Sequence, residues 1–285
     1  MTLLSPELMA RLERLQLHSR NRLVGRFGGE HVSKRFGNTL DFADFREYHP
    51  GDDFRRIDYH VMARLDQVLV KLYEADDEVT VRLMIDTSAS MGIGAKLDQA
   101  KRLAAALGFV ALIAHDAVTV HAFPDGGVPP RFAGRAAIPA LFSYLDQLTP
   151  LGGTPFTRAT GHLLSQSALP GITAVFSDLL TPEWRSLVQL RSSGSDVAVI
   201  HILCGDDLDP DYSGDLDLID TEEGNRLTVS VTEDVARSYR DRVDRWIEEI
   251  IAASHGVGAR YIPVNAEDDI EGILLTGWRR EGILR

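Results

Sequence analysis

The sequence predicts an α/β fold in which a doubly wound, mostly parallel sheet carries helices on both faces. From Val79 onward, short apolar runs alternate with longer segments whose apolar residues recur every three or four positions. This alternation is typical of parallel strands that are connected by helical crossovers. We therefore expect one sheet between two helical layers from residue 79 to the carboxyl terminus.

The expected elements follow one another in a regular order. The predicted strands are residues 80–86, 118–123, 172–178, 196–204 and 259–264. The helical periodicity occurs in residues 95–115, 135–148, 156–168, 182–193 and 232–256. Pro182 after Thr181 is a typical helix start, and Gly256 and Gly258 are typical stop signals after the longest helix. Two short alternating runs in residues 216–231 predict a small hairpin inserted before the last predicted helix.

Residues 1–78 differ in composition from the rest of the chain. Most of this part is rich in glycine, aromatic and charged residues, with little helical periodicity. We expect short strands and tight turns there, and so small a piece would bury a poor core alone. The predicted organisation is a segment of residues 1–78 that docks on a domain of residues 79–285.

The composition argues against several classes of protein. The chain has 30 Lys and Arg against 42 Asp and Glu, a formal net charge of −12, which disfavours nucleic-acid binding by the whole protein. No window of about 18 apolar residues is present, and Arg11, Glu13 and Arg14 lie where a signal peptide needs an apolar core. We therefore expect a cytoplasmic protein with no membrane span. The single cysteine, Cys204, leaves no disulfide framework and no thiolate metal site.

Charge is unevenly distributed along the chain. Residues 1–40 hold seven basic residues against three acidic ones, whereas residues 205–223 hold nine acidic residues and no basic one. We interpret the basic arm as a solvated amphipathic helix and the acidic stretch as a surface loop. Either stretch is a candidate contact for a partner of opposite charge.

Polar residues gather where the predicted strands end. The first predicted strand ends at Asp86, and Ser88 and Ser90 follow it at alternate positions. The third predicted strand ends at Asp178, and the loop before the third predicted helix carries Thr154. In an open parallel sheet, ligands bind beyond the carboxyl ends of the strands, so these five side chains can face one crevice. Two carboxylates and three hydroxyls form an all-oxygen set that suits Mg²⁺ or Mn²⁺.

Two other interpretations use the same residues. Ser88 and Ser90 could simply cap the following helix, while Asp178 begins a turn. Alternatively, Asp86 could serve a metal-dependent phosphoryl-transfer enzyme. A phosphotransferase of the haloacid-dehalogenase type, however, needs a second carboxylate two positions later, where Ser88 stands. No complete nucleotide-binding glycine loop or nucleophile elbow is present, so we expect a protein that is not an enzyme.

Two sets of motifs resemble known families. The order Asp-Thr-Ser-Ala-Ser at residues 86–90, Gly-Gly-Thr at 152–154 and Ser-Asp at 177–178 resembles the metal-ion-dependent adhesion site of von Willebrand factor A domains. Upstream, DFREYHPGDDFRRIDYHVMAR at residues 44–64 resembles the signature of the bacterial domain-of-unknown-function family number fifty-eight. Tyr59 departs from that signature, because the family usually has tryptophan there.

The resemblance implies a role for each candidate residue. Ser88, Ser90 and Thr154 would bind Mg²⁺ or Mn²⁺ through their hydroxyls, while Asp86 and Asp178 would hold the ion directly or through waters. Members of the family carry such an A domain and are commonly associated with MoxR-type AAA+ ATPases. The resemblance therefore implies a metal-dependent, chaperone-like adaptor that helps such an ATPase to assemble or activate a client protein complex. An acidic residue of the ATPase or client would complete the metal site.

Overall fold

The computed structural model describes residues 3–15, 17, 40–49, 54, 57–65, 67–75, 79–124, 127–166, 170–221 and 224–278. The chain divides into two compact units, one of Met1–Asn21 with Val79–Arg285 and one of Arg22–Glu78. The segment expected at residues 1–78 is thus divided between the two units, because its first 21 residues belong with the later domain. The expected docking of the segment on that domain stays a prediction.

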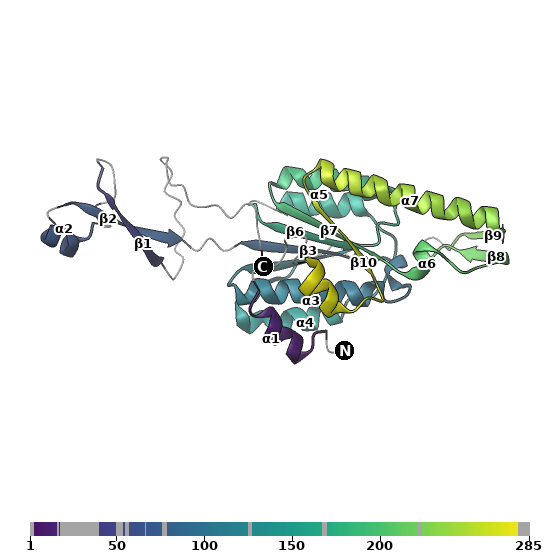
Figure 1. Cartoon of the computed structure of the whole chain (residues 1–285), viewed down its shortest axis with the longest axis horizontal. Coiled ribbons are helices and arrows are strands. Elements are labelled where there is room, and N and C mark those ends of the chain that lie inside the picture. The colour runs from purple at the N-terminus through teal and green to yellow at the C-terminus, as the bar shows by residue number, and fades with distance from the viewer. Residues whose placement is uncertain are drawn as a thin grey trace. The chain divides into compact units, whose positions relative to one another are not determined.

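The larger unit is built on a six-stranded sheet (Figure 1). Its strands are β3 (Thr80–Asp86), β4 (Ala117–Phe123), β5 (Arg131–Ala133), β6 (Ile172–Ser177), β7 (Asp196–Leu203) and β10 (Arg260–Asn265). Their spatial order is β10-β7-β6-β3-β4-β5, and every pairing is parallel except that of β4 with β5. This arrangement confirms the predicted fold class. The short antiparallel edge strand β5 was not predicted, since three residues are too few for a clear alternation.

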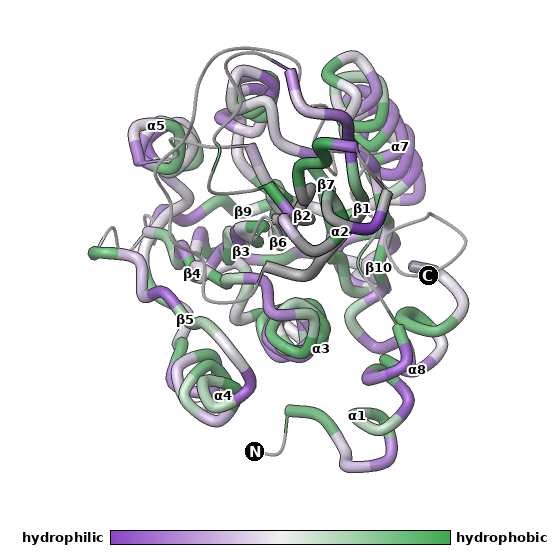
Figure 2. Tube along the Cα trace, turned by 90° about the vertical axis from the view of Figure 1, so that its left-hand side faces the viewer, coloured by the Kyte–Doolittle hydropathy of each residue, from purple (hydrophilic) through white to green (hydrophobic). Residues whose placement is uncertain are grey.

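Helices cover both faces of this sheet (Figure 2). One face is covered by α1 (Pro6–Leu12), α3 (Lys96–Ile113), α4 (Ile138–Asp146) and α8 (Ile270–Gly272). The other is covered by α5 (Phe156–Gln166), the segment Pro182–Ser193 and α7 (Glu233–Gly256). The predicted helix at residues 182–193 is a 3₁₀ helix that starts at Pro182 after the capping residue Thr181. Residues 270–278 form short helical turns after β10 that were not predicted.

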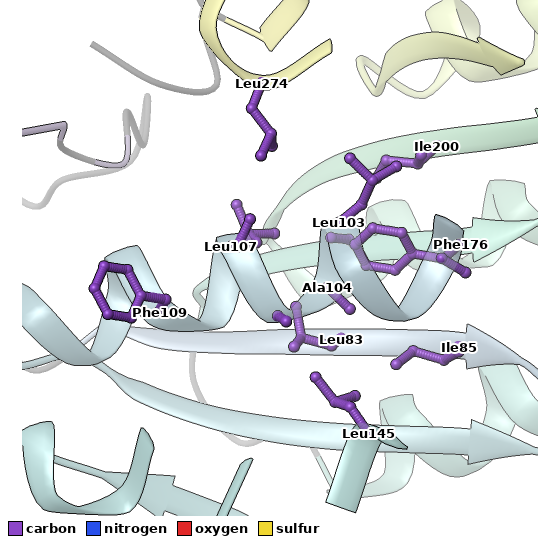
Figure 3. Packing of buried hydrophobic residues seen from close by; sticks show 14 of the residues in the cluster. Leu83, Ile85, Leu103, Ala104, Leu107, Phe109, Leu145, Phe176, Ile200 and Leu274 are labelled. Atoms are coloured by element: carbon purple, nitrogen blue, oxygen red, sulfur yellow. The ribbon is translucent and has the colours of Figure 1, made fainter. Parts of the chain in front are cut away.

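The side chains of β3 alternate between two hydrophobic clusters, one on each face of the sheet. Leu83 and Ile85 join the cluster that contains α3, whereas Met84 between them joins the cluster on the opposite face. Figure 3 shows Leu83 and Ile85 close to residues of α3 such as Ala104. Because α3 is covered by neighbouring helices as well as by the sheet, it is buried along most of its length.

Helix α1 belongs to this core although it begins the chain. Ser5 caps it by accepting a hydrogen bond of 3.1 Å from the backbone of Leu8, and Pro6 follows at the first turn. Leu8 and Leu12 are 2% and 0% exposed and pack in the same cluster as α3. Helix α1 is thus the amphipathic helix expected in the basic arm, with its apolar side buried and Glu7 and Arg11 exposed.

Two smaller elements follow β7. Helix α6 (Gly205–Leu208) opens the acidic stretch, and β8 (Gly214–Ile219) pairs with β9 (Arg226–Val231) as an antiparallel hairpin. This confirms the predicted hairpin.

The unit Arg22–Glu78 contains its own two-stranded sheet. Strand β1 (Leu40–Glu47) pairs antiparallel with β2 (Leu69–Ala75), and α2 (Tyr59–Leu65) lies between them in the chain. The side chain of Asp58 caps α2 by accepting a hydrogen bond of 3.2 Å from the backbone of Val61. Across both units, no helix in the described residues is long and apolar enough to span a bilayer.

Candidate metal centre

The strand order creates a switch point between β3 and β6. After β3 the chain moves to β4 on one side, while β6, β7 and β10 continue on the other side of β3. The helices that follow β3 and β6 therefore cover opposite faces of the sheet, which makes the carboxyl ends of these two strands a topological switch point. Asp86 ends β3 and Asp178 directly follows β6. Both carboxylates thus occupy the position at which open α/β sheets bind ligands.

Asp86 and the two serines after it form a buried group of oxygen atoms. Asp86 and Ser88 are 0% exposed and Ser90 is 7% exposed. Oδ1 of Asp86 accepts a hydrogen bond of 2.9 Å from the backbone N–H of Ser88. The Oγ atoms of Ser88 and Ser90 lie 3.0 Å apart. The tight turn after β3 therefore brings three of the five predicted residues together.

The serines do not act as helix caps. Helix α3 has Ala95 as its cap residue, and the 3₁₀ turn Ser90–Gly92 has Ala89. Within this described part of the chain, neither helix has a side-chain capping bond. The alternative explanation of the serine spacing is therefore wrong. The same interpretation also predicted that Asp178 begins a turn. That part is correct, since Oδ1 of Asp178 accepts a hydrogen bond of 3.1 Å from the backbone of Leu180.

The loop that carries Thr154 packs against the Asp86 loop. The N–H of Leu151 donates to the carbonyl of Thr87 at 2.7 Å, and the N–H of Ala89 donates to the carbonyl of Gly152 at 2.8 Å. A Cβ atom on Gly92 would lie 2.9 Å from Cγ of Pro150, so the two loops touch where glycine is required. Thr154, two residues after Gly152, is 6% exposed. These backbone bonds bring the fourth predicted residue to the same edge of the sheet.

Asp178 has a partner that the sequence analysis missed. Nζ of Lys96 lies 2.9 Å from Oδ2 of Asp178 and 3.1 Å from Oδ2 of Asp207. The side chains of Lys96 and Asp178 are 0% exposed, and that of Asp207 is 10% exposed. The prediction of an acidic surface loop is thus wrong for Asp207, which reaches inward from α6. A signal existed in the sequence, because Lys96 lies on the same helical stripe as the apolar residues Ala100, Leu103 and Leu107.

With this geometry described, the chain can be compared with known proteins. Residues 44–247 match the family model "Protein of unknown function DUF58". The chain belongs to the DUF58 family. This confirms the resemblance carried by residues 44–64.

Two relatives align with this DUF58 chain over almost its whole length. The uncharacterized proteins Rv1480 of Mycobacterium tuberculosis and Mb1516 of Mycobacterium bovis are each 26% identical to it over 98% of this chain and 92% of their own length. Among solved structures, an aerotolerance-related membrane protein from Bacteroides fragilis aligns with a TM-score of 0.43 and 20% identity, over 71% of this chain and 98% of its own. The conserved hypothetical protein BatB from Bacteroides thetaiotaomicron aligns with a TM-score of 0.40 and 17% identity, over 71% and 96%.

The charges of the DUF58 site are strongly coupled. Burial and, to a smaller extent, the nearby Asp178 carboxylate raise the pKa of Asp86 to about 7, although hydrogen bonds from Ser177 and Ser88 oppose the shift. Burial alone would lower the pKa of Lys96, but Asp178 and Asp207 outweigh it and the pKa lies above its ordinary value. Lys96 is therefore an ammonium ion at neutral pH.

Residues around Asp178 hold the site in place. Ser177 accepts a hydrogen bond of 2.9 Å from the backbone of Leu179. Leu179 has a left-handed backbone (φ 54°), which is uncommon for a non-glycine residue and is found at constrained sites. A ring nitrogen of His201, Nε2, donates at 2.9 Å to the carbonyl of Asp178, so its Nδ1 accepts at 2.7 Å from the hydroxyl of Tyr261. These contacts join three strands beneath the site.

The donor set fits a hard divalent cation. The oxygens of Asp86, Ser88 and Ser90 are gathered at one place, and the Thr154 loop lies against them. Oxygen ligands of this kind suit Mg²⁺ or Mn²⁺. Of the described side chains, no three His, Cys, Asp or Glu form a group that could hold a metal, so any cation here depends on the hydroxyls. Asp178 differs from the other candidate ligands, because one of its carboxylate oxygens already accepts a hydrogen bond from the ammonium group of Lys96.

Proposed function

We propose that this chain is a non-enzymatic protein-interaction module whose affinity for its partner depends on a bound Mg²⁺ or Mn²⁺. The residues that would hold the ion are Asp86, Ser88, Ser90, Thr154 and Asp178. The observation that carries the proposal is the buried oxygen group of Asp86, Ser88 and Ser90 at the switch point of the sheet. Hydroxyl ligands leave much of the charge of a cation uncompensated, so the ion attracts an anionic oxygen from outside. An Asp or Glu of the partner would supply that oxygen.

Exposed apolar side chains near the site support a protein partner. Ile93, Leu151 and Leu180 are 40%, 71% and 43% exposed. Each lies two or three residues along the chain from a candidate ligand, on the loops that also carry Ser90, Thr154 and Asp178. Large apolar side chains that remain exposed around a polar centre are typical of protein-interaction surfaces.

The surroundings of Asp86 favour binding over phosphoryl transfer. Both of its carboxylate oxygens accept hydrogen bonds from the chain, Oδ1 from the Ser88 backbone and Oδ2 from Ser177. These bonds fix the orientation of the carboxylate, and each oxygen keeps a lone pair that a metal ion can use. Ser88 also stands where that type of phosphotransferase needs its second carboxylate.

The proposed partner is a MoxR-type AAA+ ATPase together with a client complex that the two proteins assemble or activate. The basis of this choice is membership of the DUF58 family, together with the association with MoxR-type ATPases that the resemblance of residues 44–64 implies. The net charge of −12 supports a protein partner rather than a nucleic acid.

The test is capture of the purified MoxR-type ATPase from the same organism by the immobilised full chain. We expect capture in Mg²⁺, loss of capture with chelator, and loss with Asp86→Asn or Thr154→Ala. Ser186→Ala is the matched control, because Ser186 is a buried serine on the 3₁₀ segment away from the site. Capture that survives chelator and both site variants but disappears in moderate salt would show a metal-independent, charge-based interface instead.

A further inference from the structure

We propose that Lys96 acts as a built-in cation that competes with the divalent metal for Asp178 and so weakens metal binding. This inference rests on the proposed metal site and describes how its affinity is regulated by the chain itself.

The position of Lys96 leaves its ammonium group little freedom. Lys96 is the first residue of α3, directly after the loop that carries Ser88 and Ser90. Its side chain has no exposed surface, and Nζ contacts Asp178 at 2.9 Å and Asp207 at 3.1 Å. A buried ammonium ion that loses its carboxylate partners is strongly unfavourable, so Lys96 cannot release Asp178 at low cost.

The charge balance explains why this contact opposes the metal. Asp178 is one of only two carboxylates in the proposed ligand set, and its Oδ2 is bonded to Lys96. A divalent cation beside Asp178 would therefore meet a carboxylate that is partly neutralised and a positive charge close behind it. Like charges repel strongly in a buried environment, where solvent screening is weak.

Asp207 moderates this effect from the far side of Lys96. It shares the ammonium group with Asp178, so it compensates part of the positive charge. Oδ2 of Asp207 also accepts a hydrogen bond of 2.9 Å from the backbone N–H of Cys204. An asparagine at this position removes the charge but can keep that bond through its carbonyl oxygen.

The two residues therefore predict changes of opposite direction. In Lys96→Met, Asp178 is freed and the repulsion is removed, so we expect Mn²⁺ to bind at least about tenfold more tightly than in the unmodified chain. In Asp207→Asn, the charge of Lys96 is less compensated, so we expect binding to weaken by about tenfold. A purely structural Lys96 would give the opposite result for Lys96→Met, because loss of the support for Asp178 would weaken binding.

The experiment is titration calorimetry of the full chain and its variants with MnCl₂, combined with thermal melts with and without Mn²⁺. Lys101→Met is the matched control, because Lys101 is also buried on α3 but contacts the carbonyl of Asp146 and the carboxylate of Asp98. We expect a larger rise in Tm with Mn²⁺ for Lys96→Met than for the unmodified chain, and no change for the control.

Each outcome decides between the two proposals. Unchanged or weaker Mn²⁺ binding in a folded Lys96→Met overturns the role of Lys96 while the metal site stands. If Lys96→Met does not fold with or without Mn²⁺, Asp207→Asn decides, and unchanged or tighter binding there overturns the inference. No Mn²⁺ binding in the unmodified chain or in any folded variant overturns the metal site itself.

Discussion

The hydroxyl group of Ser177 donates a hydrogen bond of 2.5 Å to Oδ2 of Asp86. The direction of this bond follows from its surroundings, because Ser177 already accepts from the N–H of Leu179 and its own hydrogen remains for the carboxylate. The bond links the ends of β6 and β3 inside the protein, where both side chains are 0% exposed. Ser177 therefore orients the carboxylate that begins the candidate metal centre.

Ser177→Ala should weaken the metal site without removing a ligand. Loss of a hydrogen-bond partner of a ligand typically lowers metal affinity by about 10- to 100-fold. Leaving Asp86 with one donor fewer in a buried position should also cost about 1–3 kcal/mol of stability. Titration calorimetry with Mn²⁺ and urea denaturation measure the two effects. Full Mn²⁺ affinity in this variant would show that Ser177 does not position Asp86.

His121 should make the stability of the protein depend on pH. Burial, together with the charges of Arg82 and His162, lowers its pKa to about 4. The unfolded chain binds a proton at His121 near pH 6.5, whereas the folded chain does so only near pH 4. This contribution to stability is therefore complete above pH 6.5 and is lost as the pH falls from 6.5 toward 4.

The corresponding variant is His121→Gln. Between pH 7 and pH 5, it should lose about 1–2 kcal/mol less stability than the unmodified chain. Urea denaturation at the two pH values measures this difference. His255→Gln, at an exposed position near the end of α7, is the control and should follow the unmodified chain. An equal loss of stability in His121→Gln and the unmodified chain would exclude His121 as the source.

Helix α1 should be necessary for the stability of the larger unit. Leu12 is 0% exposed and lies in the cluster that contains α3, so Leu12→Ala should cost about 2–5 kcal/mol. Leu218→Ala, on the exposed hairpin strand β8, should change stability by less than about 0.5 kcal/mol. Thermal denaturation compares the two variants. Similar Tm values for both would contradict the place of α1 in the core.

Two glycines should respond to alanine in opposite directions. A Cβ atom on Gly171 would lie 2.3 Å from the carbonyl oxygen of Thr80, a backbone atom that cannot easily move. Gly171→Ala should therefore cost about 2–3 kcal/mol. A Cβ atom on Gly161 in α5 would have no described atom within 4 Å. Gly161→Ala should therefore stabilise the protein by about 0.5–1 kcal/mol. Denaturant titration checks both values, and a tolerated Gly171→Ala would show that β3 and the start of β6 are less closely packed.

The local pattern of the sequence determined the main elements and the candidate ligands. An apolar run such as residues 80–86 predicts a buried strand, because its side chains must leave water on both faces of a sheet. The strand ends then predict where Asp86 and Asp178 lie, since parallel strands present their carboxyl ends at one edge. The hairpin at 216–231 followed from equally local signals. Each of these inferences depends on residues that are close together in the chain.

Tertiary structure alone decided which distant residues meet. Lys96 contacts Asp207, which is 111 residues later, and Ser177 contacts Asp86, which is 91 residues earlier. Helix α1 is separated in the chain from the rest of its unit by Arg22–Glu78. Composition therefore could not predict that this helix packs in the core of the larger unit. Periodicity tells which side of an element is buried, but it does not tell what covers that side. The partner of a buried charge depends on the order of the strands and the packing of the helices between them, and so it appears only in the folded chain.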